Sequence, residues 1–315
     1  MAPNVPRTLL PRDLEAFARL GIPPELLAEA GVQRVSDREA RDNFGITGSV
    51  TRDMSGIVFP YFVPSLAYRV TARLRRDSPE IEEAKTKNKY ISPYGDGRHL
   101  YFPPGAEGKL KSPELPIVLV EAEKSVLALT AWAERRNAEL MPLGLGGCYG
   151  WRGRIRRVEN GRGERVDETG PLPDLSFCNG RTVFVLLDAN AATNPFVGKA
   201  RRALAAELRK RGCKVRLCSL PVLNGVNGPD DYIAICGDDA MAEVLEKAKQ
   251  INVQTGEVSR AESEWPEAMS EDAFHGFAGD FVRLVEPETE ADPQALLLTF
   301  LVGFGCMVGR VSSLV

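Results

Sequence analysis

Acidic residues follow three apolar, strand-like runs of this chain, and such residues could hold a metal ion. Glu121 follows Ile-Val-Leu-Val, Asp188 follows Val-Phe-Val-Leu-Leu, and Asp230 comes ten residues after Val-Arg-Leu-Cys-Ser-Leu. Clustered carboxylates repel one another unless a cation holds them, and hard oxygen ligands suit Mg²⁺. The three carboxylates therefore predict a metal-dependent site for phosphoryl transfer.

Four neighbouring residues extend this predicted site. Asn190 and Asp231 offer two further oxygen ligands. Lys124 would neutralise phosphate charge, or simply pair with a nearby carboxylate. Glu123 would act as a base or orient Lys124. Solvated strand ends are the alternative interpretation of each acid, but three acids on successive strands favour one shared site.

A second set of residues predicts contacts with a nucleic-acid strand. The set comprises basic side chains and one tryptophan: Arg69, Arg73, Arg75, Lys89, Trp151 and Arg152. The first three alternate onto one face of an expected strand, which could bind a phosphate backbone or be a solvated basic face. Trp151 could stack on a base or anchor a buried loop.

The elements that would position these residues form an α/β pattern. Short apolar strands alternate with helices over residues 115–250, which predicts a parallel sheet with flanking helices. Ligands of such sheets bind beyond the carboxyl ends of the strands, where the three acids lie. An insertion over residues 152–175 is expected to be an exposed hairpin or loop.

The rest of the chain divides by pattern. Residues 1–50 predict short helices, at Asp13–Leu20, Pro23–Ala30 and Ser36–Asn43, and residues 51–114 a smaller α+β subdomain with a loop at 77–89. Residues 251–263 predict a linker. A helical segment is expected over 264–315. Its apolar stretch Ala295–Gly309 is too short to span a membrane, and we interpret it as a core helix cut off from its partner.

Composition narrows the class of protein. The chain has 315 residues, 43% hydrophobic and 26% charged, with a net charge of −3, as expected of a soluble globular protein. A basic middle and an acidic tail still allow a local groove for a polyanion. Six cysteines without a CxxC pair and only two histidines argue against a zinc site and favour the reducing cytoplasm.

The acidic motifs resemble those of a known family. Val120-Glu121-Ala-Glu-Lys-Ser, Leu-Leu-Asp188-Ala-Asn190 and Pro229-Asp230-Asp231-Tyr are similar to the TOPRIM domain of bacterial-type primases, topoisomerases and some nucleases. Asp188-Ala-Asn-Ala-Ala-Thr-Asn-Pro195 resembles the TOPRIM-like domain of unknown function in phage and plasmid primase–helicase proteins. Upstream, Gly56-Ile-Val-Phe-Pro and Lys89-Tyr-Ile-Ser-Pro resemble the segment before TOPRIM in bacterial-type primases.

The resemblance implies an activity and its partners. It implies a Rossmann-like TOPRIM sheet over 115–250, preceded by a primase-like subdomain, that makes primers on single-stranded DNA from nucleotide triphosphates. Glu121, Asp188, Asp230 and Lys124 would be catalytic, with Mg²⁺ or Mn²⁺ and no zinc. Residues 264–315 resemble the entry to a helicase-like ATPase region, so a replicative helicase is a further expected partner.

Departures from the family pattern keep two alternatives open. Asn190 replaces an aspartate, Gly228 replaces the first acid of the third motif, Ser125 replaces another acid, and the usual primase zinc module is missing. The chain could therefore be a non-catalytic module that binds or loads nucleic acid in a replication complex. It could also be a TOPRIM nuclease, in which the same carboxylates use water as the nucleophile.

Overall fold

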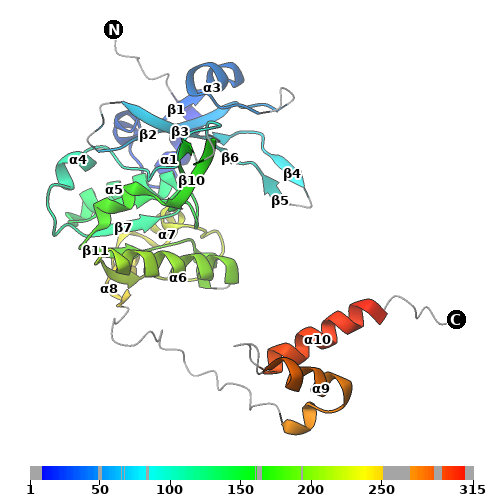
Figure 1. Ribbon diagram of the computed structural model, residues 1–315. Coiled ribbons are helices and arrows are strands. Elements are labelled where there is room, and N and C mark those ends of the chain that lie inside the picture. Colours follow the sequence, from blue (N-terminus) through cyan, green and yellow to red (C-terminus); the bar gives the residue numbers. More distant parts are fainter. Residues whose placement is uncertain are drawn as a thin grey trace. The chain divides into compact units, whose positions relative to one another are not determined.

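A computed structural model describes residues 9–48, 52–64, 66, 68–82, 85–159, 161, 165–192, 194–250, 270–286 and 293–308 (Figure 1). The chain forms two compact units, Met1–Asn252 and Val253–Val315, which are described separately. The predicted linker at 251–263 and the start of the predicted helical segment at 264–269 lie outside the described residues.

A five-stranded sheet carries the predicted acids in the first unit. Its strands, in the order β13-β12-β11-β7-β8, are β13 (Lys249–Gln250), β12 (Lys214–Leu217), β11 (Thr182–Val185), β7 (Ile117–Val120) and β8 (Met141–Gly144). The last four are parallel, and β13 joins β12 antiparallel at the edge. The predicted parallel α/β sheet is confirmed.

Both faces of this sheet are buried, as its continuous apolar strands require. Val118 and Val120 contribute to one hydrophobic cluster, and Ile117 and Leu119 to the other, because successive side chains point to opposite faces. The first face is covered by helices α5 (Glu123–Arg136), α7 (Pro229–Cys236) and α8 (Asp238–Glu246), and the second by α6 (Pro195–Lys210). Helix α7, which carries Asp230, is absent from the sequence prediction.

A smaller antiparallel sheet precedes the parallel one. Its order is β1-β2-β3-β6, with β1 (Gln33–Val35), β2 (Gly56–Phe62), β3 (Arg69–Arg76) and β6 (Tyr90–Ile91). Helices α1 (Pro11–Arg19), α2 (Pro24–Glu29) and α3 (Asp37–Phe44) confirm the predicted N-terminal helices, and the short α4 (Ala106–Lys109) leads towards β7. The loop predicted at 77–89 is wrong in part, because it contains the hairpin β4 (Glu80–Glu82)–β5 (Lys85–Lys87).

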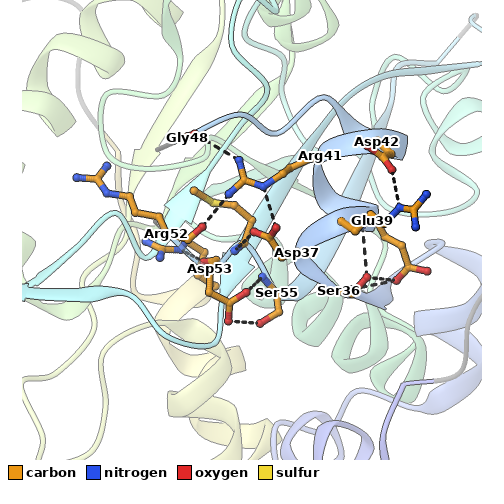
Figure 2. A network of polar contacts seen from close by, with 12 residues as sticks. Ser36, Asp37, Glu39, Arg41, Asp42, Gly48, Arg52, Asp53 and Ser55 are labelled. Atoms are coloured by element: carbon orange, nitrogen blue, oxygen red, sulfur yellow. Dashed lines mark hydrogen bonds and ion pairs between the residues drawn. The ribbon is translucent and has the colours of Figure 1, made fainter. Parts of the chain in front are cut away.

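Polar contacts fix helix α3 against the strand that follows it (Figure 2). Ser36 caps the helix by accepting a hydrogen bond from the Glu39 backbone N–H at 3.3 Å, and Glu39 accepts one from the Ser36 N–H at 3.0 Å. The Asp37 carboxylate accepts a hydrogen bond from the Met54 N–H at 2.8 Å. Arg41 donates to the Arg52 carbonyl at 2.8 Å. These contacts hold the segment that enters β2.

The predicted insertion folds as a two-stranded antiparallel hairpin. Strand β9 (Arg152–Glu159) pairs with β10 (Arg165–Pro171), with an irregularity between Glu168 and Thr169. The 3₁₀-helix η1 (Pro173–Cys178) leads from it towards β11, and η2 (Ala189–Ala192) follows β11.

The second unit contains the helices α9 (Gly276–Val285) and α10 (Pro293–Val308), preceded by η3 (Glu271–Ala273). Phe300 of α10 packs against Phe277 and Phe281 of α9, with ring centroids 5.6 and 4.7 Å away. The predicted helix at Ala295–Gly309 is confirmed over its described part, and apolar side chains on it are exposed. Leu298 and Val302 are 64% and 57% exposed. Within the described ranges, every helix is too short or too polar to cross a bilayer.

Candidate metal and nucleic-acid site

Two of the predicted acids meet at the carboxyl end of the parallel sheet. Glu121 follows β7 and Asp188 follows β11, and these two strands are hydrogen-bonded neighbours. The Asp188 N–H donates to Glu121 Oε1 at 3.2 Å, and Asn227 Nδ2 donates to Asp188 Oδ2 at 3.1 Å. Asp188 Oδ1 is buried and has no hydrogen-bond partner in the described structure. A buried carboxylate oxygen without a partner is a position that a cation would satisfy.

The electrostatics of this pair also favour a cation. Burial raises the pKa of Asp188 to about 7, and the negative charges of Glu121 and Asp230 contribute to this rise, while Lys124 opposes it. Burial likewise raises the pKa of Glu121, although the backbone N–H groups of Asp188 and Cys148 lower it. Ionising both carboxylates therefore costs free energy, and a bound cation would lower that cost.

Asp230, the third predicted acid, already has its partners. It is completely buried at the start of α7, where Lys124 Nζ donates to Oδ2 and Ser125 Oγ donates to Oδ1 at 2.6 Å. Its neighbour Asp231 lies 3.7 Å from Lys124 Nζ and accepts hydrogen bonds from the Asn227 and Gly228 N–H groups at 3.2 and 3.3 Å. Asp231 thus caps α7 as well as facing Lys124.

Gly228 packs against the acids and leaves no room for a Cβ atom. A Cβ atom at this position would lie 2.8 Å from Asp230 Oδ1, 3.1 Å from Asp188 Oδ1 and 3.3 Å from Ser125 Oγ. These oxygens therefore converge on one small volume that any other residue type would fill.

The donor set fits a divalent cation at Glu121 and Asp188. Within the described ranges, no group of three His, Cys, Asp or Glu side chains is assembled around a single point. Both oxygens of Asp230 already accept hydrogen bonds, and Asn190 is exposed on η2. Glu121 and Asp188 remain, and Asp188 Oδ1 is buried without a hydrogen-bond partner in the described structure. Hard oxygen ligands of this kind suit Mg²⁺.

Part of the predicted basic set lies beside the acids. Arg73 forms a buried ion pair with Glu123 at 3.0 Å, and its guanidinium lies 4.6 Å from the Tyr90 ring centroid. Lys89 Nζ lies 6.0 Å from the same ring centroid, and Arg75 pairs with Tyr90 across strands β3 and β6. Arg73, Arg75 and Lys89 thus gather around Tyr90 near the carboxylates.

The remaining predicted contacts lie farther along the surface. Arg69 donates to the Asn43 carbonyl at 2.9 Å and stacks 4.4 Å from the Phe44 ring. Trp151 is only 3% exposed, so its ring is not accessible to a base and serves as a loop anchor. The guanidinium of Arg152 lies 5.4 Å from the Trp151 ring centroid and is exposed.

Two adjacent pockets form a groove between the antiparallel sheet and the β9–β10 hairpin. They have volumes of about 310 and 610 Å³ and share Asp96 and Arg98. Arg73 lines the first pocket, and Arg152 and Arg154 line the second. Arg98 is a residue that sequence reasoning missed. Its signal is the run Gly97-Arg98-His99, which follows the primase-like Lys89-Tyr-Ile-Ser-Pro segment.

His99 has a structural role at the edge of this groove. Its Nδ1 lies 3.0 Å from Asp174 Oδ2, and the same carboxylate oxygen accepts the Leu100 N–H at 2.8 Å. This agrees with the absence of a metal-ligand partner near His99 in the sequence.

Comparison with known proteins places the fold. A family model described as "Domain of unknown function (DUF3854)" matches residues 109–240. A search of curated proteins finds no match. The crystal structure of the Aquifex aeolicus primase, zinc-binding and RNA polymerase domains, is similar with a TM-score of 0.51 and 15% identity. The similarity covers 77% of this chain and 57% of the Aquifex chain, so this chain matches only part of that structure.

Two further solved structures are similar at lower scores. The DnaG catalytic core has a TM-score of 0.48 and 15% identity, over 99% of this chain and 93% of that one. The primase fragment of the bacteriophage T7 primase-helicase has a TM-score of 0.39 and 15% identity, over 78% of this chain and 81% of that one. The similarity to the Aquifex structure shows a primase-like α/β fold, with a smaller antiparallel subdomain before the parallel sheet.

Proposed function

We propose that this chain is a primase-type nucleotidyltransferase, which makes primers on single-stranded DNA from nucleotide triphosphates with Mg²⁺ or Mn²⁺. The observation that carries the proposal is the pair Glu121–Asp188 on neighbouring strands, with a buried, unpartnered Asp188 Oδ1. The primase-like fold supports it. We assign residues 115–250 to a TOPRIM domain and 51–114 to a primase-like subdomain, in a cytoplasmic protein of phage or plasmid type.

Each group at the site has a role in this reaction. Glu121 and Asp188 would hold the cation, which polarises a phosphate and stabilises the leaving pyrophosphate when bound. Asp230 and Asp231 hold Lys124 at the same edge, where its ammonium would contact a phosphate oxygen. Lys89 and Arg75 would add positive charge around the triphosphate.

The groove beside the site would hold the template. Arg98, Arg152 and Arg154 line it and present charge to a phosphate backbone without reading base edges. This predicts binding that depends on salt and little on sequence. A replicative helicase is the partner we propose for the residues that follow the TOPRIM domain.

A second candidate function is a non-catalytic nucleic-acid-binding or loading module. It is favoured by one observation, the engagement of both Asp230 oxygens by Lys124 and Ser125, which leaves fewer free ligands than a three-carboxylate site. This module would bind single strands equally well with or without EDTA.

Incubation of the full chain with single-stranded DNA, labelled nucleotide triphosphates and Mg²⁺ or Mn²⁺ tests these candidates together. New short labelled products would support the primase. Shortened template without labelled products would instead identify a TOPRIM nuclease. Retention of the DNA without either reaction would support the binding module.

A further inference from the structure

Asp230 and Lys124 form an ion pair within the proposed cation site. Lys124 extends from the first turn of α5, and Asp230 occupies the first turn of α7. The Asp230 side chain is fully buried, whereas that of Lys124 is 28% exposed. The ammonium therefore caps a buried carboxylate and faces the open side of the site.

Both oxygens of Asp230 are taken by this arrangement. Oδ2 accepts from Lys124 Nζ, and Oδ1 accepts from Ser125 Oγ at 2.6 Å. A buried carboxylate that loses its ammonium partner is strongly destabilised, so the pair is expected to persist in solution. Asp230 is then no longer a free ligand for a metal ion.

Asp188 lies close to this ion pair. Asp188 Oδ1 and Asp230 Oδ1 both lie within 3.1 Å of the point where a Gly228 Cβ would be. Lys124 Nζ donates to the other oxygen of Asp230, so the ammonium lies beside the carboxylate that neighbours Asp188. Two-metal sites place their ions only about 3.5–4 Å apart, so a second divalent ion at Asp230 would compete with the ammonium for this space.

We propose that the site takes a single divalent cation, bound by Glu121 and Asp188, and that the Lys124 ammonium occupies the second cation position at Asp230. This inference rests on the proposed metal-dependent function and deepens it. Lys124 thereby supplies a fixed charge where a two-metal enzyme would recruit an ion.

The pattern of carboxylates agrees with this division. Glu121 and Asp188 lack a basic side chain as hydrogen-bond partner, because the described hydrogen bonds to them come from backbone or amide N–H groups. Asp230 and Asp231 both contact Lys124. Glu121 and Asp188 are therefore left to bind the ion, whereas Asp230 and Asp231 share the Lys124 ammonium.

Counting bound Mn²⁺ by electron paramagnetic resonance on the full chain tests the proposal. The wild-type chain should bind one ion, and Lys124→Met should bind two. Lys199→Met, an exposed lysine on α6, is the matched control and should bind one. Asp188→Asn should weaken the single site at least tenfold. Asp230→Asn should leave one ion bound within about twofold of the wild-type affinity, and it remains informative if Lys124→Met does not fold.

The outcomes separate this inference from the proposed function. Two ions on the wild-type chain, or loss of binding in Asp230→Asn, would overturn the role of Lys124 and leave a metal-dependent primase in place. A wild-type chain that binds no ion and a Lys124→Met variant that binds one would support the role of Lys124. The same result would contradict the metal site at Glu121 and Asp188. The absence of bound Mn²⁺ in both the wild-type chain and Lys124→Met would overturn both the role of Lys124 and the proposed metal site.

Discussion

Arg73 of strand β3 forms an ion pair with Glu123 of helix α5 at 3.0 Å, and this contact joins the antiparallel subdomain to the parallel sheet. Glu123 is 1% exposed and also accepts a hydrogen bond from Tyr61 Oη at 2.5 Å. Glu123 is therefore neither the base nor the partner of Lys124 that the sequence suggested. It anchors the elements on either side of the candidate site.

Removing Arg73 should destabilise the chain. Arg73→Met leaves the buried Glu123 carboxylate without its charged partner, which costs about 3 kcal/mol or more. The free energy of unfolding, measured by urea denaturation, should fall by that amount. Arg73→Met combined with Glu123→Gln should recover part of the loss, because no buried charge then remains. Arg75→Met, two residues along the same strand, is the control. An equal loss in both single variants would contradict the ion pair.

Stability should depend on the protonation of Asp188. Its folded pKa is about 7 against an ordinary value of 3.8, so the folded chain binds a proton that the unfolded chain releases between these values. The free energy of unfolding without metal should therefore decrease as pH rises from about 4 to about 7, then level off. A tenfold difference in proton affinity between the folded and unfolded chains corresponds to about 1.4 kcal/mol.

Thermal unfolding in EDTA across this pH range checks the dependence on Asp188. Asp188→Asn should flatten the decrease, since the amide does not titrate. Saturating Mg²⁺ at pH 8 should raise the melting temperature of the wild-type chain and not that of the variant. A stability curve identical in the two chains would show that Asp188 is not the titrating group.

The close packing around Gly228 should not tolerate a side chain at this position. In Gly228→Ala the new Cβ would lie 2.8 Å from Asp230 Oδ1, which Lys124 and Ser125 hold in place. We expect a loss of about 1–3 kcal/mol in stability and at least tenfold in Mg²⁺ affinity. Gly108→Ala on α4 is the control, because its Cβ would meet nothing within 4 Å. Calorimetric titration with Mg²⁺ that gives wild-type affinity for Gly228→Ala would refute this geometry.

Single-stranded DNA should bind in the groove beside the hairpin. Arg98→Ala and Arg152→Ala each remove a cation that lines it, so each should lower affinity and reduce the salt dependence by about one counterion. Fluorescence anisotropy at several salt concentrations measures both quantities. Arg38→Ala on α3, whose side chain is 90% exposed in a local i,i+4 pair, should bind like the wild type. An Arg38 effect as large as the others would mean diffuse electrostatic attraction.

The sequence predicted the parallel sheet and the placement of Glu121 and Asp188 because both follow from local pattern. Apolar strand runs alternate with helices, and an acid directly after such a strand lies at the sheet edge. The same local pattern could not predict the setting of Asp230. It lies on helix α7 rather than at a strand end, and its partners Lys124 and Ser125 are more than a hundred residues away in the sequence.

The basic residues were harder to assign from sequence. Alternation placed Arg73 on a face with Arg69 and Arg75, but a bulge at Tyr61/Phe62 and the long-range partner Glu123 give each arginine a separate setting. Trp151 likewise depends on packing that only the folded chain reveals. Side-chain partners distant in sequence, rather than local periodicity, decide which of these groups face a ligand.

Labelled nucleotide incorporation on single-stranded DNA by wild type, Glu121→Gln and Asp188→Asn tests metal-dependent nucleotidyl transfer at Glu121 and Asp188. Asp280→Asn, an exposed aspartate on α9, provides the matched control. We expect Mg²⁺-dependent products from the wild type and Asp280→Asn, and at least a hundredfold less product from the two site variants. Equal incorporation by all four chains would contradict this expectation.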